Sequence, residues 1–319
     1  MQKKQNKTLP TLIMLVGVPA SGKSTLTARY ASLGAKILSS DTIRAELSAK
    51  AETAMDERER RRINTAVFDR IAHEAREALA TGQDTVIDAT NLSRKRRMGF
   101  LGHINGIPCY KKCVLLITSP EECFRRNLGR QGNARVPDEA LHAMLTRFEC
   151  PAVGEGWDEI ETAADAIPYR FPTEELKDFS QDNPHHTLTL DEHMRKAWEH
   201  LAERGAPEHL LQVALCHDNG KLYTKRFENS RGEPTETAHY YGHECYGAYL
   251  YLAERLCGRH PSEQEREQIL YEARLIGAHM RPLNAWDRSP HAKARDEAIY
   301  GADFMKDLLL LHEADRAAH

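Results

Sequence analysis

The sequence predicts two parts of different fold class: an α/β domain with a parallel sheet and helices on both faces, followed by an all-α helical bundle. Up to about residue 170, apolar strand-like runs alternate with helical patterns, and such alternation is typical of a parallel sheet that is covered on both faces. A polar, proline-containing stretch at 171–184 ends this pattern, and only helical patterns follow it. We therefore expect an α/β domain at 1–170, a linker at 171–184 and a helical domain at 185–319.

The elements of the first part follow from its apolar runs and helical patterns. Strand-like runs lie at 11–16, 35–38, 85–88, 113–117 and 166–170. Helical patterns lie at 24–32, 42–49, 56–80, 93–105, 121–130 and 137–148. Because open α/β sheets bind their ligands at the carboxyl ends of the strands, functional residues should come directly after strands.

The stretch GVPASGKS at 17–24 follows the first strand-like run and precedes the first helical pattern. It fits the phosphate-binding pattern G-x-x-x-x-G-K-[ST] at every fixed position. Its glycines let backbone N–H groups point at phosphate oxygens, and the helix start adds its positive end. The pattern predicts that Lys23 contacts the β and γ phosphates of ATP or another nucleoside triphosphate, and that the Ser24 hydroxyl binds Mg²⁺. The residues expected to bind ATP in this loop are Gly17, Gly22, Lys23, Ser24 and Thr25. The alternative is a strand-to-helix turn that binds nothing.

The stretch SSDTIR at 39–44 follows the second strand-like run. An aspartate in this place would lie beside the γ-phosphate, so Asp41 is a candidate general base for an attacking hydroxyl. Arg44 comes one helical turn later, shares the face of Asp41 and could bind an anionic group of the acceptor. In the alternative interpretation, Asp41 only caps a helix and Arg44 is a solvated charge.

The third strand-like run ends in the sequence DATN at 88–91. Asp88 could serve the water shell of the metal, and Thr90 and Asn91 could position acceptor or phosphate, although a simple turn explains these residues equally well. The basic run RKRR at 94–97 predicts a solvated helix face. Contact with a phosphate backbone is the alternative for that run.

Arginines at 125, 126 and 130 precede a glycine-containing break. This pattern predicts a mobile lid in which Arg126 and Arg130 contact the donor phosphates and spread positive charge over the transferring phosphoryl group. Ordinary solvated arginines are the alternative.

These motifs together resemble the phage-type polynucleotide 5′-kinases and the kinase modules of bacterial RNA-repair enzymes, over roughly residues 10–150. The resemblance implies that Lys23 and Ser24 bind phosphate and Mg²⁺, and that Asp41 is the general base. It also implies that Arg44 binds the phosphate next to the 5′-hydroxyl of the acceptor, and that Arg126 and Arg130 are lid residues. Small-molecule kinases of the same class share all of these features except the acceptor contacts.

The second part has helical patterns at 189–203, 207–218, 239–257, 262–279 and 295–317 and is dense in histidine. Its candidate metal ligands, in chain order, are His193, His217, Asp218, His243, His279 and Asp315. Neutral imidazoles and carboxylates suit a divalent ion such as Mg²⁺, Mn²⁺, Fe²⁺, Co²⁺, Ni²⁺ or Zn²⁺. Supplied from separate helices, they could form a rigid cage with positions left for water and phosphate. An inert helical bundle is the alternative, and we expect His185, His186, His239 and His312 to be structural or to lie outside the ligand set.

This ordered set, with the sequence HDNGK at 217–221, resembles the HD phosphohydrolase superfamily. The resemblance implies that His193, His217, Asp218 and Asp315 hold one metal ion. It implies that His243 and His279 bind a second metal or the substrate phosphate, that Lys221 neutralises phosphate charge, and that a metal-activated water attacks phosphorus.

Composition limits the location of the protein. Seven scattered cysteines without CxxC pairs favour a reducing cytoplasm over a disulfide framework or a zinc ribbon. No apolar run approaches the length of a membrane helix. The apolar run behind the basic start belongs to the phosphate loop, so we expect no signal peptide and a cytoplasmic protein.

A 5′-hydroxyl kinase joined to a phosphohydrolase predicts an enzyme that heals nucleic-acid ends. We expect it to phosphorylate 5′-OH ends of RNA or DNA and to remove a 2′ or 3′ phosphate or a 2′,3′-cyclic phosphate. A small-molecule kinase fused to an HD nucleotidase is one alternative. A regulatory protein that senses ATP without turnover is another, although such a sensor has no use for a base beside the γ-phosphate.

Overall fold

The computed structural model describes residues 9–49, 56–184 and 187–318. Chain contacts divide it into two compact units, Met1–Leu116 with Glu155–Ala163, and Ile117–Gly154 with Ala164–His319. Each unit has its own core. The predicted boundaries of the domains and of the linker stay a prediction, and so does the expectation for His185 and His186, which lie outside the described residues.

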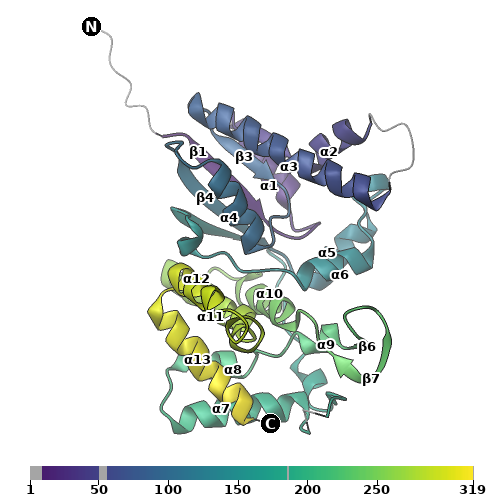
Figure 1. The fold of residues 1–319 in the computed structure, drawn as a ribbon, viewed down its shortest axis with the longest axis vertical. Coiled ribbons are helices and arrows are strands. Elements are labelled where there is room, and N and C mark those ends of the chain that lie inside the picture. Colours follow the sequence, from purple (N-terminus) through teal and green to yellow (C-terminus); the bar gives the residue numbers. More distant parts are fainter. Residues whose placement is uncertain (1–8, 50–55, 185–186, 319) are drawn as a thin grey trace. The chain divides into compact units, whose positions relative to one another are not determined.

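The first part of the chain alternates strands and helices as the sequence predicts (Figure 1). Its elements are β1 (Thr11–Val16), α1 (Lys23–Ser32), β2 (Lys36–Ser39), α2 (Ser40–Ser48), α3 (Glu57–Ala80), β3 (Thr85–Asp88), α4 (Arg94–His103), β4 (Tyr110–Ile117), α5 (Pro120–Leu128), α6 (Asp138–Leu145) and β5 (Glu159–Ala164). The strands form a five-stranded sheet of order β2-β3-β1-β4-β5. The pairs β1–β3, β1–β4 and β2–β3 are parallel.

Both faces of this sheet are covered, as its apolar strands require. On one face, Ile13 and Leu15 pack with Leu26 and Tyr30 of α1. The alternate residues of β1, such as Met14, face the other side of the sheet and are fully buried as well. A strand that is buried on both faces reads as a continuous apolar run, which is why β1 is recognisable in the sequence.

The last strand of the sheet lies earlier in the chain than the sequence predicts. We expected a strand at 166–170, but β5 is formed by Glu159–Ala164, and the expected segment has no strand structure. The strand β5 is an edge strand that is only half-buried, so it tolerates charged residues. Lys112 of β4 forms ion pairs with Glu159 and Glu161 across the two strands. These cross-strand charges explain why the run does not look like a strand in the sequence.

The second part of the chain is mainly helical, in agreement with the prediction. Its elements are α7 (Leu190–Glu203), α8 (Glu208–Ala214), α9 (Lys221–Thr224), β6 (Arg226–Glu228), β7 (Pro234–His239), α10 (His243–Leu256), α11 (Glu263–Ala278), α12 (Pro290–Tyr300) and α13 (Ala302–Ala317). Short 3-10 turns lie at Gly132–Ala134, Val153–Glu155 and Thr173–Leu176, and a π turn lies at Pro282–Trp286. Capping boxes start two of the helices, with Thr189 and Glu192 at α7 and Ser262 and Glu265 at α11.

Three helix predictions in this part have the wrong extent. The helix expected at 207–218 ends at Ala214, so that His217 and Asp218 lie in a turn before α9. The helix expected at 239–257 starts only at His243, because His239 ends β7 of the antiparallel hairpin β6–β7 and a turn at 240–242 follows it. The helix expected at 295–317 is two helices, which meet at Gly301 with a backbone φ of 86°. Gly301 adopts that positive φ without the steric cost that a side chain would add.

Candidate functional sites

The phosphate loop lies between β1 and α1, as its sequence pattern predicts. Gly22 adopts a φ of 93° and caps the N-terminus of α1, a conformation that favours glycine. Lys23 opens the helix, and its Nζ donates to the carbonyl oxygens of Gly17 at 2.8 Å and Val18 at 2.7 Å. Ser24 and Thr25 are exposed on the first turn of α1. The loop therefore presents a cation, hydroxyl groups and a helix N-terminus on one side.

Asp41 and Arg44 lie at the carboxyl end of β2, on the first turns of α2. As their spacing predicts, they share one face of the helix, and Nη1 of Arg44 donates to Oδ1 of Asp41 at 2.6 Å. Asp41 does not cap α2: the N-cap is Ser39, and the Asp41 side chain is 90% exposed. The capping alternative is therefore wrong, and the carboxylate is open to a ligand.

Asp88 ends β3, and its backbone is in register with Ser39 of β2. Burial raises the pKa of Asp88, the charge of Lys23 lowers it, and the charge of Asp41 raises it. The charge of Asp88 therefore interacts with Lys23 of the phosphate loop and with Asp41 at the start of α2. Asp88 thus belongs to the same polar edge of the sheet, although its partial burial distinguishes it from the open Asp41.

Thr90 and Asn91 make structural bonds next to the phosphate loop. The carbonyl oxygen of Thr90 accepts from the backbone N–H of Gly17 at 3.0 Å. The buried Nδ2 of Asn91 donates to the carbonyl oxygen of Leu15 at 2.8 Å. These bonds hold the end of β3 against the end of β1, and the expected acceptor contacts of both residues stay a prediction.

The two expected lid arginines have different surroundings. Arg126 is ion-paired with Glu122 at 2.6 Å and with Asp165 at 2.6 Å. Arg130 is half-exposed, and its Nη1 donates to the carbonyl oxygen of Ala134 at 3.4 Å. Both lie in the second compact unit, whereas the phosphate loop lies in the first. Their role at the donor phosphates stays a prediction.

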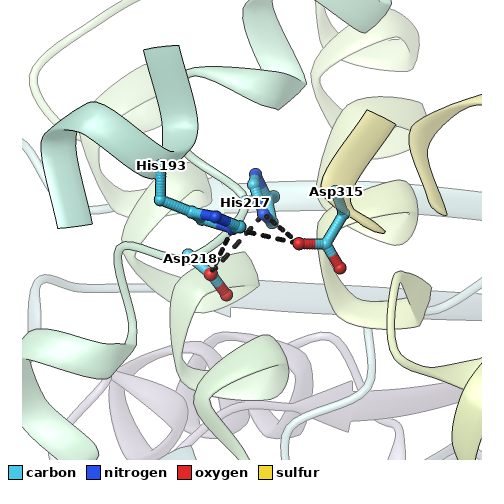
Figure 2. Close-up of side chains that lie close together, drawn as sticks. All are labelled: His193, His217, Asp218 and Asp315. Atoms are coloured by element: carbon cyan, nitrogen blue, oxygen red, sulfur yellow. Dashed lines mark hydrogen bonds and ion pairs between the residues drawn. The ribbon is translucent and has the colours of Figure 1, made fainter. Parts of the chain in front are cut away.

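Four of the predicted metal ligands meet inside the helical part. His193 comes from α7, His217 and Asp218 from the turn after α8, and Asp315 from α13 (Figure 2). One ligand atom from each residue lies within 4.8 Å of the others. Nε2 of His193 lies 3.0 Å from Oδ1 of Asp315 and 3.4 Å from Oδ2 of Asp218. Nε2 of His217 lies 3.5 Å from Oδ1 of Asp315.

A second cluster of Asp218, His243 and His279 shares its aspartate with the first. Here the other carboxylate oxygen, Oδ1, lies 3.1 Å from Nε2 of His243 and 3.5 Å from Nε2 of His279. The two imidazole Nε2 atoms are 3.2 Å apart. Asp218 thus turns one oxygen toward each histidine pair.

The tautomers of the histidines fit metal ligation. Nδ1 of His217, His243 and His279 faces a backbone carbonyl oxygen three residues earlier, at 2.9, 2.7 and 2.7 Å. A carbonyl accepts only from an N–H, so these bonds place the proton on Nδ1 and leave the Nε2 lone pair to point into the cluster. Nε2 of His217 is buried and makes no hydrogen bond to the described residues. The donor set therefore suits a divalent cation.

Opposite charges inside the cluster shift the pKa values of His193 and Asp218. Burial by itself lowers the pKa of His193, but hydrogen bonds and charge from Asp218 and Asp315 raise it to about 9. Burial opposes ionisation of Asp218, yet the charge of Lys221 holds its pKa well below the ordinary value. Nζ of Lys221 lies 2.7 Å from Oδ2 of Asp218.

Gln181 is a further member of the site that the sequence analysis did not identify. It is 1% exposed, and its Oε1 accepts from Nζ of Lys221 at 2.8 Å. Its Nε2 donates to the carbonyl oxygen of Leu188 at 3.2 Å. Gln181 fixes the ammonium of Lys221 and belongs to the stretch that we expected to be a linker. An isolated glutamine in a polar stretch gives no signal in the sequence.

Comparison with known proteins supports the assignment of the first part. A family profile described as an AAA domain matches residues 12–151. The first part of the chain, with its parallel sheet, is a kinase-like P-loop domain. A domain of this kind implies ATP as ligand, together with Mg²⁺. No curated protein matches the chain.

Solved structures that resemble the kinase-like domain include kinases with different acceptors. A chain of the Pnkp1/Rnl/Hen1 RNA repair complex is 24% identical with a TM-score of 0.35, and the match covers 46% of this chain and 46% of that chain. A gluconokinase from Sinorhizobium meliloti 1021 is 21% identical with a TM-score of 0.35, covering 50% of this chain and 85% of its own. A fungal RNA kinase is 15% identical with a TM-score of 0.35, and the match covers 50% of this chain and 75% of that chain. The present chain thus spans about half of the RNA-repair chain.

The described residues contain no helix with the length and apolar character that a bilayer crossing requires.

Proposed function

We propose that the chain is a bifunctional enzyme that heals nucleic-acid ends. The kinase-like domain transfers the γ-phosphoryl group of ATP to a 5′-hydroxyl of RNA or DNA. The helical part acts as an HD-type phosphohydrolase that removes a 2′ or 3′ phosphate or opens a 2′,3′-cyclic phosphate. Together the two reactions produce ends that a ligase can join.

The kinase half of the proposal is supported by the Asp41–Arg44 pair beside the phosphate loop. Asp41 takes the proton of the 5′-hydroxyl as its oxygen attacks the γ-phosphorus, and ADP leaves. Arg44 binds the phosphate on the 3′ side of the terminal nucleoside, and this contact aligns the hydroxyl. Lys23 and the N–H groups of the loop stabilise the charge of the transferring group, and the Ser24 hydroxyl would help to hold Mg²⁺.

The hydrolase half is supported by the buried His–Asp clusters. His193, His217, Asp218 and Asp315 would hold one divalent cation, and His243 and His279 together with Asp218 would hold a second. Cations bound there would lower the pKa of water and neutralise phosphate charge. Lys221 adds a fixed positive charge next to the cluster, where it attracts the substrate phosphate.

One observation carries the proposal: a chain with a P-loop, and with an exposed carboxylate on α2 paired with an arginine, also carries a carboxylate shared by two pairs of inward-pointing imidazoles. The first arrangement suits a hydroxyl acceptor with a neighbouring phosphate, and the second suits phosphate-ester hydrolysis. A small-molecule kinase needs no Arg44 beside its base. A nucleotide sensor needs neither Asp41 nor the shared carboxylate.

The test is phosphoryl transfer from labelled ATP to 5′-OH oligonucleotides of RNA and DNA, alongside nucleosides and sugars as acceptors. Release of phosphate from 3′-phosphate and 2′,3′-cyclic phosphate ends is measured in parallel with a panel of divalent metals. We expect label on the oligonucleotides with wild type but not with Lys23→Ala, and phosphate release with wild type but not with Asp218→Asn. Label on nucleosides or sugars alone would establish the small-molecule kinase instead. No transfer to any acceptor by folded, metal-loaded protein would contradict the kinase half.

A further inference from the structure

The basic run at 94–97 on α4 separates into residues with opposite roles. Arg97 is fully buried, and its guanidinium forms a bidentate pair with Glu155 at 2.6 and 2.7 Å. The prediction of a solvated face is therefore wrong for Arg97, which is part of the core. Arg96, one residue earlier, points elsewhere: its guanidinium carbon lies 3.5 Å from the centroid of the Phe68 ring.

Stacking on Phe68 prepares Arg96 to bind an anion. A guanidinium that lies flat on an aromatic ring keeps its N–H groups in plane, where they remain available at the rim. Arg96 is half-buried. Burial, and then the charge of Arg44, lower the pKa of Arg96. Two arginines whose charges repel each other gain stability when a phosphate lies between or beside them.

A cavity of about 420 Å³ opens next to this guanidinium. Its lining includes Phe68, Asn91, Ser93, Lys95, Arg96 and His103. Three of these side chains carry or can carry positive charge, and Asp69 is the single acidic residue that lines it. The cavity thus combines cationic groups, hydrogen-bonding groups and an aromatic ring, which is the chemistry that accepts a nucleotide.

Contacts lead from the candidate general base to this cavity. Arg44, which bonds to Asp41, also donates from Nη2 to Oδ1 of Asn64 at 3.2 Å. Asn64 lies one turn before Phe68 on α3. The path from Asp41 through Arg44 and Asn64 reaches Phe68, which carries Arg96. An acceptor whose terminal hydroxyl meets Asp41 would therefore extend toward Arg96.

We propose that Arg96, held over the ring of Phe68, binds the second phosphate of a polynucleotide acceptor, and that the adjacent cavity receives the nucleotide that carries this phosphate. The inference rests on the proposed kinase function and makes it more specific. Arg44 binds the phosphate nearest the 5′-hydroxyl, and Arg96 binds the next one along the strand. The site then favours acceptors with two phosphates over acceptors with one.

The experiment compares a 5′-OH dinucleotide with one internal phosphate and a 5′-OH trinucleotide with two. Both end in a 3′-hydroxyl, so the proposed hydrolase has no terminal phosphate to remove. For wild type we expect the KM of the trinucleotide to be about ten-fold lower than that of the dinucleotide, the gain of one charge-assisted contact. Arg96→Ala should abolish that difference and leave the KM for the dinucleotide and for ATP unchanged. Arg96→Lys should keep part of the difference in KM between the two acceptors, because lysine keeps the positive charge but loses the planar stacking.

The matched control is Arg29→Ala, which removes an exposed arginine near the end of α1; it should leave both KM values unchanged. A second readout is the salt dependence of binding of a labelled 5′-OH oligonucleotide, whose log–log slope should fall by about 0.7 in Arg96→Ala, the value for one phosphate contact on a single strand.

An unchanged KM ratio and an unchanged salt slope would overturn the role of Arg96. If wild type phosphorylates no oligonucleotide, the proposed function fails, and the salt slope alone then decides whether Arg96 contacts a phosphate.

Discussion

Nε2 of His243 lies 3.1 Å from Oδ1 of Asp218. The second oxygen of the same carboxylate faces His193 at 3.4 Å. One buried aspartate therefore connects two groups of ligands that are supplied by different helices. Variants of Asp218 and of His243 should consequently differ in how many metal ions they lose.

If each cluster holds a metal ion, as proposed, Asp218→Asn should lose both ions and His243→Gln should lose one. An amide cannot bridge two cations as a carboxylate does, whereas the loss of one imidazole leaves the first cluster intact. We expect the affinity of the affected positions to fall by more than about 100-fold, the upper range for the loss of a supporting group. Metal content after dialysis measures this. His209→Gln is the control, because His209 pairs with Asp307 outside the clusters; equal metal loss in all three variants would argue against two adjacent positions.

Asp41→Asn should reduce the kcat of phosphoryl transfer by about 10²–10⁴-fold, the usual contribution of a general base. The amide keeps the size of the side chain but accepts no proton. Steady-state transfer from labelled ATP measures the change, and phosphate release in the helical part should stay at the wild-type level. Glu46→Gln is the control, since Glu46 is an acidic residue on the same helix that pairs with Arg70. A normal kcat for Asp41→Asn would exclude Asp41 as the base.

Gly220→Ala should destabilise the helical part by about 1–3 kcal/mol, as overpacking does. A Cβ at this position would press on the carbonyl oxygen of His243 and lie 2.7 Å from the backbone nitrogen of Gly247. The turn that carries Asp218 would then have to move away from α10. Denaturant unfolding and metal content measure the two effects. Gly102→Ala serves as the control: its Cβ would meet no atom within 4 Å, and a helical alanine should stabilise by about 0.5–1 kcal/mol.

The stabilisation by Glu122 should depend on pH. A hydrogen bond from Arg125, and then one from Arg126, lowers the pKa of Glu122 from 4.5 to about 2, against the opposing effect of burial. A carboxylate with a lowered pKa in the folded state stabilises the protein above its unfolded pKa and loses this effect as the pH falls toward the folded pKa. The difference in stability between wild type and Glu122→Gln should therefore be constant from pH 8 to about 5. It should shrink between about pH 4.5 and 2. Unfolding curves at each pH measure it, and a gap that stays constant down to pH 2 would contradict the ion-paired state.

Local patterns in the sequence predicted the elements that depend on local interactions. The run at 12–16 before Gly17 is a strand because it is apolar throughout, and α7 starts at Leu190 because the capping box of Thr189 and Glu192 satisfies its first N–H groups. Local patterns gave wrong elements where contacts with residues far along the chain determine the secondary structure. The edge strand β5 is stabilised by charges that pair with Lys112, and the expected helix at 207–218 ends early so that Asp218 can turn into the cluster.

The sequence by itself determined the phosphate loop, the helical character of the second part, and the residue types available for catalysis. These features follow from short-range spacing, backbone freedom at glycine and helix capping. Only the tertiary structure decided that Asp218 lies between two histidine pairs, that Gln181 holds Lys221, and that Arg97 is buried while Arg96 lies on Phe68. Such contacts join residues that are far apart in the chain, and they form only when the burial of apolar surface brings the helices together.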